Sequence, residues 1–262
     1  MVTTRLYRAE GVVLKSAPTG EGDLVVTLYT QEAGKLRAMA WGARKTTSRK
    51  MGHLEPLSRV ELALTRGANL DTINQVQGLE SFQGLRSSLE SISRGFYVAE
   101  LVDGFGAEGS PNPDMYFLFL DTLRFLDASP DGEMALPFFE LHMLKACGFM
   151  PELYHCVECR QSLSPGEHRF CVALGGVLCL RCAPSGPRIF PLSLQVLKTL
   201  RFLDRNPISS LSGIRFQEPF RGELKGLLGD VTRYWLDREV RAGAFLDHLD
   251  RSRKQKPIAR EG

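Results

Sequence analysis

The first third of the chain reads as five short strands with no helix among them, and this run limits the fold more than any other feature. Apolar and polar residues alternate or cluster in short segments that Gly- and Pro-containing turns separate, which is the pattern of strands. The segments are residues 11–16, 22–30, 34–41, 58–65 and 70–82. Five such strands closed into a small barrel have the count and length of an OB-fold, whose strand face and loops bind single-stranded nucleic acid. The same count also fits an SH3-like barrel.

The third of these strands continues into a basic segment. Because side chains alternate along a strand, the odd-numbered residues from 35 to 41 should share one face, which places Trp41 beside basic groups. A single strand of nucleic acid needs cations for its phosphates and a flat ring for its bases. The sequence therefore predicts a nucleic-acid-binding set made of Lys35, Arg37, Trp41, Arg44, Lys45, Arg49 and Lys50. The alternative is a barrel in which Trp41 is part of the core and the charges are only solvated.

Two Cys-x-x-Cys pairs form the strongest motif of the chain, at Cys156, Cys159, Cys179 and Cys182. Two thiolates of one tight turn can reach the same metal, and two such turns complete a tetrahedron. The separation of the pairs falls in the range of four-cysteine zinc sites. We therefore predict one structural Zn²⁺ ion, since four thiolates leave no open coordination position for catalysis. Of the other thiols, Cys147 is expected in the core and Cys171 on a small hairpin that turns at residues 175–176, and His155 is expected beside the metal or on the surface.

From about Gly84 the pattern is helical. Asn112 can cap a helix that begins at Pro113, and this helix is apolar almost all round, so we expect it to be the central buried helix of the domain. Gly148, with Pro151 beyond it, is a stop signal for the helix before it. The expected helices lie within residues 85–105, 113–128, 136–147, 192–206 and about 219–245. The predicted fold class is α+β with several domains: a five-stranded OB-fold barrel, then a helical domain that carries the zinc module.

Composition excludes several classes. The net charge is +3, so binding to a polyanion must come from local clustering of charge. The N-terminus has no apolar signal region, and the most apolar run, residues 115–126, is too short to span a bilayer, so we expect a soluble cytoplasmic protein. No Walker loop, zinc-deaminase pattern or histidine-containing triad is present in the sequence, and no enzymatic activity is predicted.

Several segments resemble the RecO family of bacterial recombination mediators. They are EGVVLKSAPTGEGDLVVTLYTQEAGKLRAMAWGARKTTSR, YVAEL, FFELHMLKACGFMPEL and the CVEC and CLRC pairs. The resemblance is collinear over nearly the whole chain and is strongest at residues 10–80 and 138–182. It implies an OB-fold, a helical domain and a zinc module. It also implies binding of single- and double-stranded DNA, annealing of complementary strands and, with RecR, loading of RecA onto DNA coated with single-stranded DNA-binding protein.

The resemblance also implies a pocket in the helical domain for the acidic, Phe-ended tail of single-stranded DNA-binding protein. The candidate cations for this tail are Arg124, Lys145, Lys198 and Arg201. The expected domains are the barrel at 1–82, the helical domain at 83–155 and 183–250, the zinc module at 156–182 and a basic tail at 251–262. The rival interpretations are a scaffolding zinc protein and an RNA-binding OB-fold protein.

Overall fold

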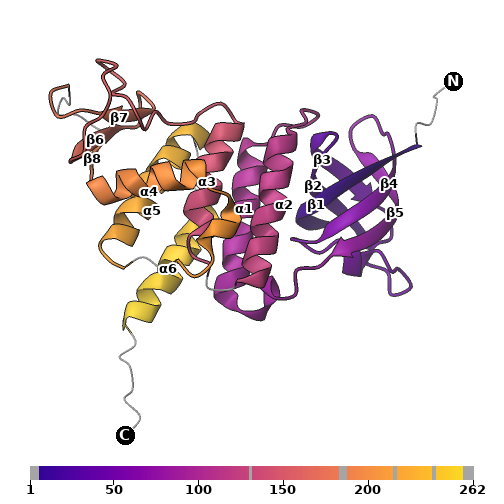
Figure 1. Ribbon diagram of the computed structural model, residues 1–262. Helices are drawn as coiled ribbons and strands as arrows, with labels where there is room; N and C mark the ends of the chain where they lie inside the picture. The colour runs from indigo at the N-terminus through magenta and orange to yellow at the C-terminus, as the bar shows by residue number, and fades with distance from the viewer. Residues whose placement is uncertain (1–5, 130–131, 183–187, 215–216, 238–239, 256–262) are drawn as a thin grey trace, which may run out of the picture. The chain divides into compact units, whose positions relative to one another are not determined.

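The computed structural model of the 262-residue chain describes residues 6–129, 132–182, 188–214, 217–237 and 240–255 (Figure 1). The chain forms two compact units, and the first is discontinuous in sequence. Unit 1 contains residues 1–130 and 240–262, and unit 2 contains residues 131–239. Among the described helices, none is long and apolar enough to cross a membrane.

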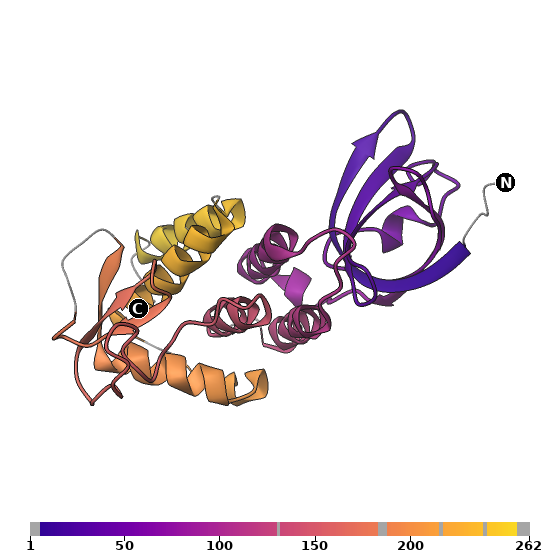
Figure 2. The same ribbon diagram turned by 90° about the horizontal axis from the view of Figure 1, so that it is seen from above.

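Unit 1 begins with a closed five-stranded barrel, around which the strands curl in Figure 2. The strands are β1 (Leu6–Thr19), β2 (Asp23–Thr30), β3 (Gly34–Ala40), β4 (Arg59–Thr65) and β5 (Asp71–Glu80). The order is β1-β2-β3-β5-β4, β1 pairs with β4 to close the ring, and β3 and β5 are parallel. This is the predicted OB-fold, and the SH3-like alternative is wrong. A register shift between Val13 and Lys15 lets the long β1 bend and pair with both neighbours.

Apolar residues at alternate strand positions fill the barrel. The fully buried members include Val13, Val26, Leu28, Ala38, Val60, Leu62, Leu64 and Ile73. Short 3₁₀ turns lie at Met51–His53, before β4, and at Leu85–Ser87, after β5. The predicted alternation is therefore present, and it leaves the odd-numbered residues of β3 on the outside of the barrel.

Two helices follow the barrel within unit 1, α1 (Leu89–Phe105) and α2 (Pro113–Ala128). The Asn112 side chain accepts a hydrogen bond from the Met115 N–H at 3.0 Å, which confirms the predicted cap. Most apolar residues of α2 are buried, but the Phe117 side chain is 47% exposed. Phe117, Asp121 and Arg124 lie along one helical stripe that faces solvent.

Ion pairs join the barrel to α2. Arg59 on β4 lies between two carboxylates, with 2.8 Å to Glu10 and a second contact to Glu80. Glu80 also accepts two hydrogen bonds from Arg124 at 3.0 and 2.6 Å, and Glu10 accepts one from the Tyr116 hydroxyl. The barrel and α2 are thus held together by a chain of charge-assisted hydrogen bonds.

The expected single helix at 219–245 is wrong, because two helices occupy this part of the chain. The first, α5 (Phe220–Leu236), ends at Asp237, whose backbone is left-handed at φ 52°. The second, α6 (Arg241–Gln255), is part of unit 1. The Glu100 carboxylate on α1 accepts hydrogen bonds from the Arg241 and Ala242 N–H groups at 2.9 and 2.7 Å and so caps the start of α6. The expected basic tail is helical up to residue 255, and residues 256–262 lie outside the described part of the chain.

Unit 2 packs three helices with a small sheet. The helices are α3 (Ala135–Ala146), α4 (Leu194–Arg205) and α5, with a 3₁₀ turn at Ile208–Leu211. The strands are β6 (His168–Cys171), β7 (Gly176–Leu178) and β8 (Ile189–Leu192), in the order β7-β6-β8. The β6–β7 hairpin confirms the prediction. Strand β8 was not predicted, and its Pro191 is tolerated because β8 is an edge strand.

Candidate nucleic-acid interface and metal site

The outer face of β3 carries part of the predicted nucleic-acid-binding set. Ala38 and Ala40 are fully buried inside the barrel, whereas Arg37 is exposed. The Trp41 side chain, one residue after the strand, is 57% exposed. The alternative in which Trp41 belongs to the core is therefore wrong. An exposed indole beside a guanidinium offers both a stacking platform and a phosphate-binding cation.

The loop after β3 is fastened to the turn between β1 and β2. The Asp23 carboxylate accepts a hydrogen bond from the Gly42 N–H at 2.6 Å, and the Arg44 N–H donates to the Gly22 carbonyl at 2.9 Å. The aliphatic stem of Lys45 lies against both glycines, and its atoms would be only 3.5 Å from a Cβ at either position. The loop is thus held in one conformation that presents Arg44 and Lys45 on the surface.

Two of the predicted basic residues are engaged within unit 1. The Lys35 ammonium donates to the Asp103 main-chain carbonyl at 2.7 Å and lies 3.6 Å from its carboxylate. The Lys50 ammonium donates to the Ile73 carbonyl on β5 at 3.0 Å. In contrast, Arg37, Arg44, Lys45 and Arg49 are exposed and make no ion pair with any described residue. We call these four residues and Trp41 the basic face.

The four predicted metal ligands come together in unit 2. All four sulfur atoms lie within 4.8 Å of one another, and the Cys159 and Cys179 sulfurs are 3.9 Å apart. Sulfurs at the corners of a tetrahedron with Zn–S bonds of about 2.3 Å are separated by about 3.8 Å. The donor set and its spacing therefore fit a tetrahedral metal ion. His155 is exposed and lies near Glu152, outside the sulfur cluster.

Main-chain N–H groups prepare one of the thiols as a ligand. Burial raises the pKa of Cys156, but N–H donors from Cys179, Cys159 and Glu158 outweigh it and lower the pKa to about 6. Hydrogen bonds with the Cys159 and Cys179 side chains raise the pKa of Cys182 to about 12. Because metal ligands must be thiolates, binding of a metal would release protons from this set. A main-chain hydrogen bond between Val157 and Val177 at 2.9 Å joins the two Cys-x-x-Cys turns.

The candidate cations for an acidic tail are divided between the units and differ in their contacts. In unit 1, Arg124 pairs with Glu80. In unit 2, Lys145 pairs with Asp204 at 3.0 Å, and Arg201 donates to the Leu153 carbonyl at 2.9 and 2.7 Å. Lys198 on α4 is exposed and has no ion-pair partner among the described residues.

Sequence reasoning missed the residues that anchor these sites. Asp23 and Asp103 fix the loop and the lysine beside the basic face, but their partners lie 19 and 68 residues away in sequence. It also missed the Tyr154 ring, over which the guanidinium groups of Arg201 and Arg205 lie at 5.1 and 4.7 Å. The available signal for this group of aromatic and arginine side chains was the position of Tyr154, two residues before Cys156.

Comparison with known proteins gives one consistent result. The profile for Recombination protein O N terminal matches residues 2–82, and the profile for Recombination protein O C terminal matches residues 86–243. The DNA repair protein RecO of Pelotomaculum thermopropionicum is 38% identical over 94% of this chain and 95% of its own length. The DNA repair protein RecO of Roseiflexus sp. is 37% identical over 94% of this chain and 86% of its own length. The DNA repair protein RecO of Desulforudis audaxviator is also 37% identical, over 92% of this chain and 96% of its own length. The chain therefore belongs to the RecO family.

Proposed function

We propose that the chain is a DNA repair and recombination protein that binds single- and double-stranded DNA through the basic face of its barrel. The observation that carries this proposal is the group of four exposed basic side chains between residues 37 and 49, together with exposed Trp41, none of the four paired with a described carboxylate. Cations that are not engaged inside the protein can replace the counterions of a DNA strand. Membership of the RecO family supports a role in DNA repair.

We further propose that the protein anneals complementary strands without acting as an enzyme. Two strands repel each other through their phosphates, and a basic surface that neutralises both lowers this repulsion while base pairs nucleate. Duplex formation is itself downhill, so no nucleotide hydrolysis is needed. The basic face supplies what annealing needs, namely positive charge, an aromatic ring and a loop held in one conformation.

The cysteine cluster is proposed to hold one structural Zn²⁺ ion. The ligands would be Cys156, Cys159, Cys179 and Cys182, and their spacing supports a closed tetrahedral site. The ion would tie the two Cys-x-x-Cys turns together and so stabilise unit 2. The chemistry of such a site is structural, because four thiolates leave no position for a water molecule or a substrate.

The proposed protein partners follow from the family. They are RecR, the acidic tail of single-stranded DNA-binding protein and, functionally, RecA, and the protein would work in the cytoplasm at the nucleoid. For the tail, the surface of α4 is favoured over Arg124, since Arg124 is already paired with Glu80. Lys198 lies on α4 one turn before Phe202, whose side chain is 37% exposed, so these two residues offer a cation and an apolar contact. Arg201, the other candidate on α4, is engaged with the Leu153 carbonyl and the Tyr154 ring.

A salt series tests the DNA proposal. Single-stranded DNA binding is measured for the wild type and for the variant Arg37→Ala/Arg44→Ala/Lys45→Ala/Arg49→Ala. Each lost phosphate contact should lower the slope of log K against log salt by about 0.7, so four contacts should lower it by about 2.8. A control variant removes the same number of charges from other exposed positions, Arg8, Arg66, Arg181 and Lys198.

The comparison of the two variants decides the result. The proposal requires a shallower slope for the basic-face variant and little change for the control, with equal melting temperatures. An equal loss in both variants would mean that binding follows total charge and not this face. Failure of the wild type to bind any nucleic acid would favour the scaffolding alternative. Preference for an RNA competitor over DNA of the same sequence would favour the RNA-binding alternative.

A further inference from the structure

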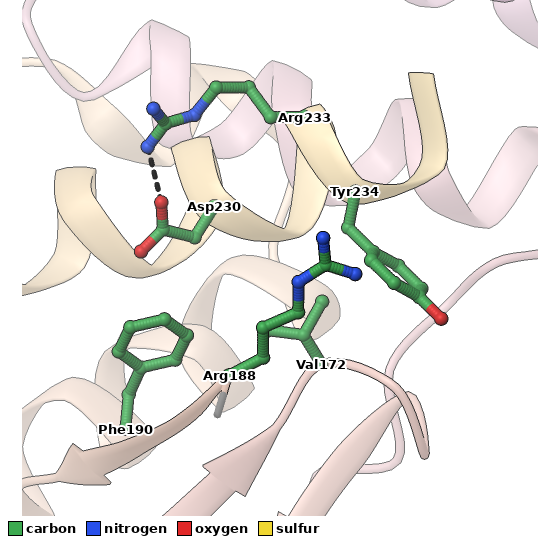
Figure 3. A pocket seen from close by; sticks show the side chains of 6 residues that line it. All are labelled: Val172, Arg188, Phe190, Asp230, Arg233 and Tyr234. Atoms are coloured by element: carbon green, nitrogen blue, oxygen red, sulfur yellow. Dashed lines mark hydrogen bonds and ion pairs between the residues drawn. The ribbon is translucent and has the colours of Figure 1, made fainter. Parts of the chain in front are cut away.

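A small cavity in unit 2 lies between the sheet and α5 (Figure 3), and none of the four clustered cysteines lines it. Its volume is about 210 Å³, below the roughly 300 Å³ at which pockets for drug-sized ligands begin. The lining residues are Val172, Arg188, Phe190, Asp230, Arg233 and Tyr234. The cavity therefore has room for one flat ring system, with aromatic, cationic and anionic groups around it.

The sheet places two of these side chains on one face. The Val172 N–H donates to the Arg188 carbonyl at 3.2 Å, and Phe190 is paired with Phe170 on β6. Figure 3 shows the side chains of Arg188, which directly precedes β8, and of Phe190 within β8 both pointing toward α5. Asp230, Arg233 and Tyr234 lie three and four residues apart on α5 and form one helical face.

Arg188 is held in an unusual way. Its φ angle is 64°, a left-handed conformation that costs a non-glycine residue about 1 kcal/mol or more. Its guanidinium lies 4.8 Å from the centroid of the Tyr234 ring. It makes no ion pair with any described residue, whereas Arg233 is paired with Asp230. The backbone thus bears strain while the side chain remains a cation without a carboxylate partner, as is common at binding sites.

We propose that this cavity binds one nucleotide of a single DNA strand, as a second contact beyond the basic face. The base would stack against the Phe190 ring and the Arg188 guanidinium plane, and a flanking phosphate would pair with Arg188. Aromatic rings and arginine planes are the surfaces on which proteins hold unstacked bases. This inference rests on the proposed function, since it assumes that the chain binds DNA.

The Asp230 carboxylate offers a hydrogen-bond acceptor to a base. Asp230 borders the cavity (Figure 3). One of its carboxylate oxygens is paired with Arg233, and the other can accept a hydrogen bond from the exocyclic amino group of a base. The charges at the cavity therefore favour a ligand that has one anionic group and a hydrogen-bond donor on a flat ring.

The test uses the full chain and short oligodeoxyadenylate that carries the fluorescent base 2-aminopurine. The first variant is Arg188→Gly, which removes the cation and relieves the strained φ angle, so the fold should be at least as stable as the wild type. The matched control is Arg160→Gly, because Arg160 is also exposed, has φ 61° and belongs to unit 2, but lies outside the cavity. The second variant is Tyr234→Ala, with Tyr234→Phe as its conservative control.

We expect Arg188→Gly to weaken binding about tenfold, the size of one lost base stack. Tyr234→Ala should weaken binding to a similar extent, because the Tyr234 ring holds the Arg188 guanidinium in place. Quenching of 2-aminopurine should decrease in parallel, and the two controls should bind like the wild type. Ultraviolet cross-linking of the wild type should yield nucleotide adducts at Phe190 or Tyr234. The same measurements in the basic-face variant should show the same tenfold difference, because the two contacts are separate.

Unchanged affinity in both Arg188→Gly and Tyr234→Ala would overturn this inference and leave the proposed function intact. A loss that is equal in Arg160→Gly would also overturn it, since general charge would then explain the effect. Arg188-dependent binding of an acidic peptide with a terminal Phe, without binding of the oligonucleotide, would identify a peptide site instead. If the pocket variants lose affinity while the basic-face variant does not, the cavity stands and the proposed interface on the barrel fails.

Discussion

Lys35 donates a hydrogen bond from its ammonium group to the main-chain carbonyl of Asp103, at 2.7 Å. The Asp103 carboxylate lies 3.6 Å from the same ammonium and 2.9 Å from that of Lys15. One residue near the end of α1 therefore joins β1, β3 and a helix. Lys35 therefore holds unit 1 together, whereas its neighbour Arg37 on the same strand faces solvent.

The first prediction separates these two roles. Lys35→Met should lower the free energy of unfolding by about 1–2 kcal/mol, since a hydrogen bond to a charged group is lost, and should leave the salt slope of DNA binding unchanged. Arg37→Met, two residues along the same strand, should leave the free energy of unfolding unchanged and lower the salt slope of DNA binding. Urea unfolding and fluorescence anisotropy measure the two effects. A lower salt slope in a stable Lys35→Met protein would mean that Lys35 does contact DNA.

The second prediction concerns the metal site. Cys156→Ser should release zinc and lower the unfolding temperature of unit 2, because metal binding contributes directly to folding in small four-cysteine sites. Binding of DNA to the barrel should persist. Metal analysis and hydrogen exchange of the two units measure this, with Cys147→Ser as the control thiol outside the cluster. Loss of DNA binding together with zinc, in a protein that remains folded, would contradict the division of roles between the units.

The third prediction concerns pH and Glu80. Hydrogen bonds from Arg124 and Arg59 lower the pKa of Glu80 below its ordinary value of 4.5, although burial opposes this. Because the folded pKa is the lower one, the contribution of Glu80 to stability is complete above the unfolded pKa and is lost as the pH falls through the folded pKa. The free energy of unfolding of the wild type should fall as the pH drops below about 5, and we call this part of the pH profile the acid limb. Glu80→Gln should therefore make the acid limb less steep, by at most about 1.4 kcal/mol per pH unit.

Unfolding in denaturant at a series of pH values measures this acid limb. Glu21→Gln, at an exposed carboxylate in the turn between β1 and β2, is the matched control and should keep the wild-type limb. At neutral pH, Glu80→Gln should cost about 1 kcal/mol, since both of its partners are partly exposed. An acid limb as steep as that of the wild type would show that Glu80 is not the titrating group.

The fourth prediction concerns the start of α6. Glu100→Ala should expose the first N–H groups of α6 and lower the free energy of unfolding of unit 1 by about 1–2 kcal/mol, the range of a lost helix cap. Hydrogen exchange of residues 241–249 should become faster before that of the barrel. Glu90→Ala in the first turn of α1 is a control on the same helix. Unchanged exchange in α6 would mean that the cap contributes little to its attachment.

The barrel and the cysteine cluster could be predicted because their determinants are local in sequence. Alternation from Val60 to Leu64 shows which face of that strand is buried, and the spacing of each Cys-x-x-Cys pair is set by one tight turn. The exposure of Arg37 and Trp41 follows from the same alternation. These features do not depend on which distant segment becomes their neighbour.

Other features depended on contacts between distant residues. The end of α5 at Asp237 is not marked by Gly or Pro, and the start of α6 is fixed by Glu100, far away in sequence. The first half of β1 was missed because its strand character comes from pairing with β4. The structural roles of Lys35 and Lys50 could not be separated from those of their neighbours, since Asp103 and Ile73 decide them.

The discontinuity of unit 1 has a consequence for biosynthesis, because its last helix follows unit 2 in the chain. A ribosome would release the barrel, α1 and α2 first, then all of unit 2, and only then α6. The α1 surface that α6 contacts, near Tyr97, must therefore wait until unit 2 has been made. A nascent or truncated chain without α6 would expose this apolar surface, and chaperones or proteases that recognise it could distinguish chains that lack α6 from those that have it.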